Sequence, residues 1–163
     1  MSGESPVVGI WHFSYTVSDL DRSVKFYSDL LGFRLVHEQS QANEYTRRLV
    51  GYPDADIRVA MLTIGDVAGP SGHILELVEY RHPIGERLDT QPKNVGAAHL
   101  ALLVPDVRAL VARLKGSGVR FRSTGELPVA IEAGRNKGGY TCYLYDPDDF
   151  IIEIQQPRPG WDG

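Results

Sequence analysis

The chain is poor in cysteine and has no long apolar run. Its 163 residues include one cysteine, Cys142, so no disulfide can form within the chain. Such sparse cysteine usage is typical of a reducing compartment, and we expect a cytoplasmic protein. No apolar stretch approaches the roughly 18 residues that a membrane span needs, and no secretory signal is visible. We therefore expect a soluble protein without a membrane anchor.

The chain also lacks a basic run. Its formal charge is −4 at pH 7, from 17 Lys and Arg against 21 Asp and Glu. A nucleic acid would be repelled on average, because no cluster of cations offers it an electrostatic footprint. The 42% hydrophobic and 23% charged residues are typical of one ordinary globular domain. A small molecule is therefore the expected partner, and neither nucleic acid nor membrane is.

What the sequence does contain is an internal repeat. Two stretches of the first half match the second half at one constant offset, and a third stretch matches at a shorter offset. The matched residues are 9–12 with 96–99, 17–20 with 104–107, and 70–77 with 147–154. The chain therefore reads as two copies of one unit whose ends agree and whose middle loops differ in length.

Each copy predicts a strand, a helix and then three strands. Residues 10–17 alternate side-chain types, as a strand with two different faces does. One face carries His12, Ser14 and Thr16; the other, expected in the core, carries Trp11, Phe13, Tyr15 and Val17. The later strands are expected at residues 33–38, 58–64 and 73–80 in the first copy, and at 119–123, 140–145 and 150–155 in the second.

The two expected helices use the same start and stop signals. Ser18 or Asp19 can cap the first helix, and Gly32 supplies a left-handed residue at its end. In the second copy Asp106 caps the helix, and a glycine, Gly116 or Gly118, stops it. The two helices are therefore predicted to be equivalent.

The remaining segments set the domain boundaries. The longest loops, residues 39–57 and 124–139, fall at the same place in each copy and are candidates for covering a site. Residues 81–95 are rich in proline and glycine, as a linker is. We predict one domain over residues 8–157, with module one at 8–80, the linker at 81–95, module two at 96–157, and tails at 1–7 and 158–163.

Four potential metal ligands recur at matching points of the repeat: His12 with His99, and Glu76 with Glu153. Side chains at i and i+2 of a strand point the same way, so each ligand can face a site while its neighbours fill the core. Glu153 lies in an apolar stretch, where an unpaired carboxylate would be costly. Two imidazoles and two carboxylates suit one divalent ion such as zinc, nickel, cobalt, manganese or iron. The other histidines have no such counterparts, and we take His37, His73 and His82 as ordinary.

These residues resemble the vicinal oxygen chelate superfamily, which includes glyoxalase I, methylmalonyl-CoA epimerase, extradiol dioxygenases, fosfomycin-resistance proteins and bleomycin-binding proteins. The most specific stretches are His12 with residues 17–23, 26–27 and 31–33, and residues 145–148 leading to Glu153. The resemblance implies an α+β fold in which two paired βαβββ modules form a U-shaped mixed sheet around a metal site, with the helices outside. It also implies a homodimer, and it identifies His12, Glu76, His99 and Glu153 as the metal ligands.

Within this superfamily, the leading interpretation is a metal-dependent lyase or isomerase that moves a proton next to a chelated carbonyl. Glu153 is the first choice for the proton-transferring carboxylate, as in glyoxalase-like members, and Glu76 is the second. Glyoxalase I typically carries an arginine and an asparagine that bind glutathione where this chain has Thr16 and Tyr80. This departure disfavours glyoxalase I itself.

Two alternatives remain open. An iron-dependent extradiol-type dioxygenase would use His12, His99 and Glu153 as ligands and Tyr143 as a catalytic tyrosine. A non-catalytic, antibiotic-binding resistance protein would stack a planar ligand on an aromatic side chain; the candidates are Trp11, Tyr45, Tyr52 and Tyr140.

Overall fold

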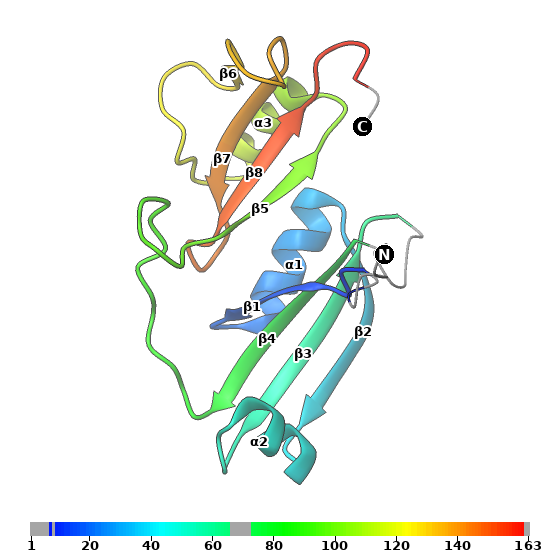
Figure 1. Cartoon of the computed structure of the whole chain (residues 1–163), viewed down its shortest axis with the longest axis vertical. Helices are drawn as coiled ribbons and strands as arrows, with labels where there is room; N and C mark the ends of the chain where they lie inside the picture. The colour runs from blue at the N-terminus through cyan, green and yellow to red at the C-terminus, as the bar shows by residue number, and fades with distance from the viewer. Residues whose placement is uncertain (1–6, 8, 66–72, 162–163) are drawn as a thin grey trace, which may run out of the picture. The chain divides into compact units, whose positions relative to one another are not determined.

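The computed structural model describes residues 7, 9–65 and 73–161. The chain divides into two compact units, Met1–Glu86 and Arg87–Gly163, each with its own four-stranded mixed sheet (Figure 1). The fold class is α+β, as the sequence predicts. The part of the repeat at residues 70–72, the amino-terminal tail up to residue 6, and the last two residues lie outside the described residues. No helix in the described part of the chain is long and apolar enough to cross a membrane.

The first unit contains four strands and two helices. They are β1 (Phe13–Val17), α1 (Leu20–Leu31), β2 (Arg34–Gln41), α2 (Glu44–Val50), β3 (Asp56–Thr63) and β4 (Ile74–His82). The strand order is β1-β4-β3-β2, in which β1 and β4 are parallel and the other pairs are antiparallel. The first and last strands of the unit therefore lie side by side.

The second unit repeats this topology with one helix. Its elements are β5 (His99–Leu103), α3 (Val107–Gly116), β6 (Val129–Ala130), β7 (Tyr140–Tyr145) and β8 (Ile151–Gln156). The order β5-β8-β7-β6 again places the first strand parallel to the last and the others antiparallel. The repeat in the sequence is thus a repeat of strand pairing.

The helix ends follow the predicted signals. The side chains of Asp19 and Asp106 each accept a hydrogen bond from the backbone N–H three residues on, at 2.9 Å in both helices. Gly32 ends α1 in the left-handed conformation, with φ of 77°. The helix α3 ends at Gly116, and Gly118 takes the left-handed conformation beyond it. Local chemistry therefore decides both helix boundaries.

One face of each sheet is buried under a helix. In the first unit α1 turns Leu20, Ser23 and Tyr27 inward, and the Tyr27 ring makes an edge contact with Phe33 at 5.6 Å between centroids. In the second unit the inward residues of α3 are Val107, Val111 and Leu114. We call the sheet face that α1 or α3 leaves uncovered the open face of that unit.

Two expectations about the middle segments are wrong. The expected loop 39–57 contains α2, which Asn43 caps at its start. A helix of seven residues spans about two turns, too few for a clear periodic signal. The expected strand 119–123 makes only an isolated bridge, from Phe121, and the edge strand β6 comes instead from the expected loop 124–139. Pairing with β7, which is non-local, decides which segment becomes the strand.

Two further expectations differ at element ends. Trp11 was placed with the core stripe, but its side chain is 56% exposed. It precedes β1, so the strand alternation that buries Val17 does not extend to it. At the other end of the unit, β4 continues through His82, two residues into the expected linker.

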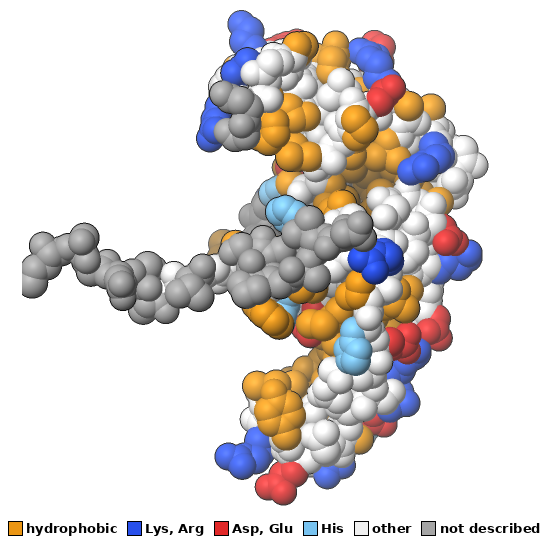
Figure 2. Space-filling model, turned by 90° about the vertical axis from the view of Figure 1, so that its right-hand side faces the viewer, with side chains coloured by type: hydrophobic (Ala, Val, Ile, Leu, Met, Phe, Trp, Pro, Cys, Tyr) orange, Lys and Arg blue, Asp and Glu red, His pale blue; other side chains and the backbone are white. Residues whose placement is uncertain are grey.

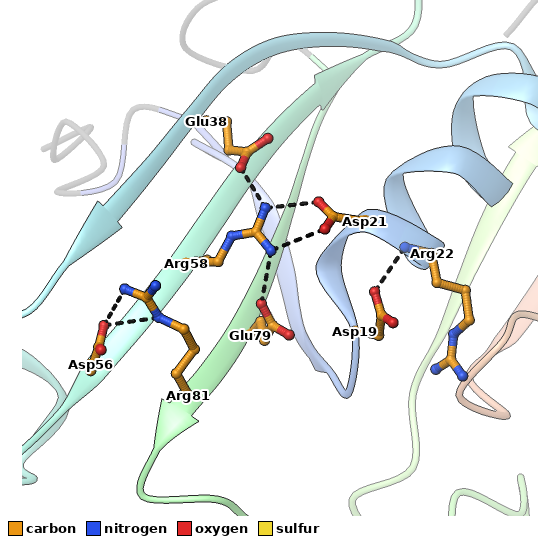
Figure 3. A network of polar contacts seen from close by, with 8 residues as sticks. All are labelled: Asp19, Asp21, Arg22, Glu38, Asp56, Arg58, Glu79 and Arg81. Carbon is orange, nitrogen blue, oxygen red and sulfur yellow. Dashed lines mark hydrogen bonds and ion pairs between the residues drawn. The ribbon is translucent and has the colours of Figure 1, made fainter.

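Arg58 joins four elements of the first unit on the face that α1 covers (Figure 3). From β3 its guanidinium reaches Asp21 of α1 at 2.8 Å, Glu38 of β2 at 2.7 Å and Glu79 of β4 at 3.3 Å. Hydrogen bonds to Asp21 first and Glu38 second raise the pKa of Arg58 above its usual range. In return, the hydrogen bond and charge of Arg58 lower the pKa of Asp21. One cation therefore compensates three carboxylates.

Elsewhere the surface charges are also mixed. His82, one of the histidines taken as ordinary, lies with Nε2 2.6 Å from Asp54 Oδ2. Figure 2 shows basic and acidic side chains next to one another along the face in view. Such mixing agrees with the absence of a basic run in the sequence.

Replacing Arg58 by methionine is expected to lower the free energy of unfolding by about 1–2 kcal/mol at neutral pH, because the carboxylates lose their shared cation. The Asp21 share of this stability is present above its ordinary pKa of 3.8, and it is lost as the pH falls through the lowered pKa of the folded state. Urea unfolding of wild type, Arg58→Met and a control, Arg48→Met, at neutral pH and at about pH 2 tests this. A wild-type advantage that does not shrink in acid would contradict the prediction.

Candidate metal and active site

The parallel strands β1 and β4 place His12 and Glu76 together on the open face of the first unit. Ser14 is the register partner of Glu76, so both face the same side of the sheet, and His12 immediately precedes β1. His12 Nε2 lies 3.5 Å from Glu76 Oε2. The structure thus brings the first two predicted ligands into contact.

The second unit does the same with β5 and β8. Ala101 is the register partner of Glu153, and His99 lies two residues before Ala101. His99 Nε2 lies 3.2 Å from Glu153 Oε2. Each unit therefore holds one His–Glu pair, built on the same register.

A pair is only half of a ligand set. Within residues 7, 9–65 and 73–161, no three His, Cys, Asp or Glu side chains gather closely enough to hold an ion. Structural zinc sites take four protein ligands and catalytic ones usually three. Neither pair is therefore sufficient by itself for such a site.

The donors of these pairs nevertheless fit a divalent ion. His12 Nδ1 is buried and has no hydrogen-bond partner among the described residues. Nδ1 lies across the ring from Nε2, so the nitrogen that an ion beside Glu76 would bind is Nε2. Imidazole nitrogen beside carboxylate oxygen is a donor set that zinc, nickel, cobalt, manganese and iron accept.

The two carboxylates differ in their support. The Thr141 hydroxyl of β7 donates a hydrogen bond of 2.8 Å to Glu153 Oε1, which leaves Oε2 facing His99. In the first unit the corresponding neighbours of Glu76 on β3 are Met61 and Val59, neither of which has a side-chain donor. Glu153 is therefore held from two sides, whereas among the described residues the Glu76 carboxylate contacts His12 alone.

Tyr143 lies beside the second pair. It is the register partner of Glu153, and its ring centroid is 5.3 Å from that of His99. Burial raises the pKa of the Tyr143 phenol, and the charge of Glu153 raises it further. Tyr143 is thus a protonated hydrogen-bond donor at neutral pH. The adjacent Cys142 points to the buried face, where burial raises its pKa to about 11 and keeps the thiol protonated.

The aromatic side chains considered for stacking a planar ligand are not equivalent. Tyr45 is 67% exposed on α2. Tyr52 already packs edge-on against Tyr80, with centroids 6.1 Å apart. Tyr140 lies under the guanidinium of Arg108, 4.6 Å from its ring centroid. Two of the four candidates therefore have partners within their own unit.

Sequence patterns missed a β-bulge at the edge of each open face. In the first unit the register shifts between Leu35 and His37, so an extra residue is inserted there opposite β3. In the second unit the backbone N–H groups of Arg122 and Ser123 both donate to the Tyr143 carbonyl, at 2.9 and 3.3 Å. A bulge breaks the two-residue period of a strand, and periodicity therefore cannot reveal which side chains it places on the open face.

The chain is similar to known proteins over most of its length. Residues 9–154 match the model of the Glyoxalase/Bleomycin resistance protein/Dioxygenase superfamily. The chain is 37% identical over 151 residues to a 2-epi-5-epi-valiolone epimerase of Actinomyces sp, covering 90% of this chain and 78% of the relative. It is 32% identical over 148 residues to a lactoylglutathione lyase of Haemophilus influenzae, covering 89% and 90%. A glyoxalase family protein of Bacillus cereus shares the fold, with a TM-score of 0.78, 19% identity, and coverage of 97% and 99%.

The hydrogen bond from Thr141 to Glu153 is expected to contribute measurably to the free energy of unfolding. Thr141→Val should lower the free energy of unfolding by about 1 kcal/mol, because it removes the donor and keeps the shape of the side chain. Thr141→Ser retains the hydroxyl and should stay closer to wild type. Urea unfolding of the three proteins provides the comparison, and a valine variant as stable as wild type would argue against a supporting role for this bond.

Proposed function

Because the chain belongs to the Glyoxalase/Bleomycin resistance protein/Dioxygenase superfamily, we propose that it is a divalent-metal-dependent lyase or isomerase that moves a proton next to a carbonyl of a small substrate. The observation that carries this proposal is the His–Glu pair, repeated in the same register in both units. The names of the two relatives, an epimerase and a lyase, support the same type of chemistry.

The proposed metal ligands are His12, Glu76, His99 and Glu153. The short contact between imidazole nitrogen and carboxylate oxygen in each pair supports this assignment, because divalent ions accept such mixed donors. When bound, a divalent ion supplies Lewis-acid polarisation of the substrate carbonyl. Zinc, nickel, cobalt, manganese and iron all suit these donors.

We propose Glu76 as the carboxylate that takes the proton. The sequence ranks Glu153 first, but Glu153 accepts a hydrogen bond from Thr141. A carboxylate that must move to the substrate carbon needs to be free of such restraints. Glu76 has no such tie to its neighbours on β3. In this arrangement a Glu76 oxygen accepts the proton from the carbon next to the carbonyl. Glu153 keeps a fixed position, and the protonated hydroxyl of Tyr143, whose pKa is raised, is available beside it to donate a hydrogen bond to the substrate.

Glutathione conjugates are not our proposed substrates. Thr16 and Tyr80 stand where the glyoxalase I pattern has its glutathione-binding arginine and asparagine. Burial also raises the pKa of Tyr80, whose ring packs against Tyr52. A tyrosine in this environment fills space rather than binding a charged tripeptide.

The second candidate function is an iron-dependent ring-cleaving dioxygenase. The contact between the Tyr143 and His99 rings favours it, because a phenol next to the ligand pair can hydrogen-bond a catechol oxygen. Its proposed ligands are His12, His99 and Glu153. Oxygen uptake with catechol by the iron-loaded protein distinguishes it from the lyase or isomerase.

Metal content provides the first test. Inductively coupled plasma mass spectrometry should find about one divalent ion per chain, lost in the double variant His12→Ala/His99→Ala. Two ions per chain would mean that each pair binds its own ion and would contradict the proposed stoichiometry. A protein without metal after reconstitution would contradict the proposal.

The assignment of the base has its own test. Glu76→Gln should lower the rate of proton exchange by about 10²–10⁴-fold, as expected for loss of a general base, and leave more metal bound than Glu153→Gln does. Deuterium uptake from solvent into a 2-oxo acid such as 2-oxobutyrate, followed by NMR, measures the rate, and metal analysis of the same samples provides the control. A wild-type rate of proton exchange in Glu76→Gln would contradict this assignment and favour Glu153 as the base.

A further inference from the structure

Arg122 lies on the open face of the second unit. The bulge that contains it is opposite Tyr143 of β7, and the preceding residue, Phe121, bridges Leu144. The Arg122 side chain donates a hydrogen bond of 3.0 Å from Nη1 to the Tyr145 hydroxyl. Tyr145 is two residues from Tyr143 on β7, so both tyrosines share the face that carries Glu153. The contact with Tyr145 therefore places the guanidinium on that face.

Only β7 separates Arg122 from the predicted ligand pair. Tyr143 is opposite Glu153 across β7 and β8, and its ring lies against His99. Adjacent strands are about 4.8 Å apart, so the Arg122 and Glu153 backbones lie roughly 10 Å apart across the sheet. A small molecule at the His99–Glu153 pair can span this distance over the Tyr143 ring.

The neighbouring arginines Arg87 and Arg120 form ion pairs with an acidic side chain, whereas Arg122 forms none among the described residues. Asp149 pairs with both Arg120 and Arg87, and the Arg87 contact is 2.7 Å. Arg120 also lies over the Tyr145 ring, 5.0 Å from its centroid, and helps to hold that side chain. In the described residues, Arg122 has no acidic partner, and its side-chain contact is the Tyr145 hydroxyl. Most of its five N–H donors therefore remain available.

An exposed arginine is usually just solvated, but three observations together set Arg122 apart. It is positioned by a bulge, oriented by a tyrosine whose own position is supported, and aligned across β7 with Glu153, one of the proposed metal ligands. A guanidinium is always charged, and its planar donors match the paired oxygens of a carboxylate or phosphate. We propose that Arg122, oriented by Tyr145, binds an oxyanion group of the substrate, so that this site acts on carboxylate- or phosphate-bearing molecules. This inference rests on the proposed function and adds the substrate class.

Anion binding by the full chain tests the proposal. Inorganic phosphate and acetate are the two probes, titrated into protein treated with EDTA and followed by the NMR signals of the arginine Nε–H groups. Wild type should bind at least one probe saturably, with shifts centred on Arg122. Arg122→Gln should weaken that binding by about tenfold or more. Arg122→Lys keeps the charge but not the planar donors, so its affinity should lie between those of wild type and Arg122→Gln. The probe that binds more tightly identifies the oxyanion.

The controls separate this site from the metal site. Arg113→Gln removes a surface arginine of α3 and should leave binding unchanged. Because EDTA removes metal, failure of the proposed metal site would not alter the titration, and Arg122→Gln should keep the metal content of wild type after reconstitution. Equal anion binding by Arg122→Gln and wild type, or no saturable binding by wild type, would overturn the proposal.

Discussion

The parallel pairing of the first and last strands in each unit is the constraint on which the candidate site depends. It places Ser14 beside Glu76 and Ala101 beside Glu153. Because side chains alternate along a strand, His99 in β5 then faces the same side as Glu153, and His12, just before β1, contacts Glu76. A slip of one residue in either pairing would point the glutamate side chain to the other face of the sheet, into the core under the helix. Strand register therefore decides whether these ligands meet.

The helices make this register costly to change. Leu75 and Leu77 flank Glu76 on β4 and are fully buried, as are Ile152 and Ile154 around Glu153. A shift that moved a carboxylate inward would also expose these apolar side chains, each worth roughly 1.5–3 kcal/mol when buried. Core packing on one face thus positions the chemistry on the other.

The two units share a topology but not a chemical environment. Around Glu153 the β7 neighbours are a threonine and a tyrosine, whereas around Glu76 the β3 neighbours are methionine and valine. The first environment supplies hydrogen-bond donors and the second supplies none. Duplicated scaffolds can divide roles in this way, with one carboxylate held in place and the other left free. The same contrast underlies our assignment of Glu76 as the base.

Much of this organisation is readable from local sequence. The His and Glu positions, the capping aspartates and the left-handed Gly32 all carry signals within a few residues, because strand alternation and helix capping are local effects. The short helix α2 and the edge strand β6 were missed, since one is too short for periodicity and the other depends on pairing with β7. The sequence by itself determined the repeat, the α+β class and the candidate ligands. Only the tertiary structure decided that Thr141 supports Glu153 and that a bulge places Arg122 on its face, because both depend on contacts between strands distant in sequence.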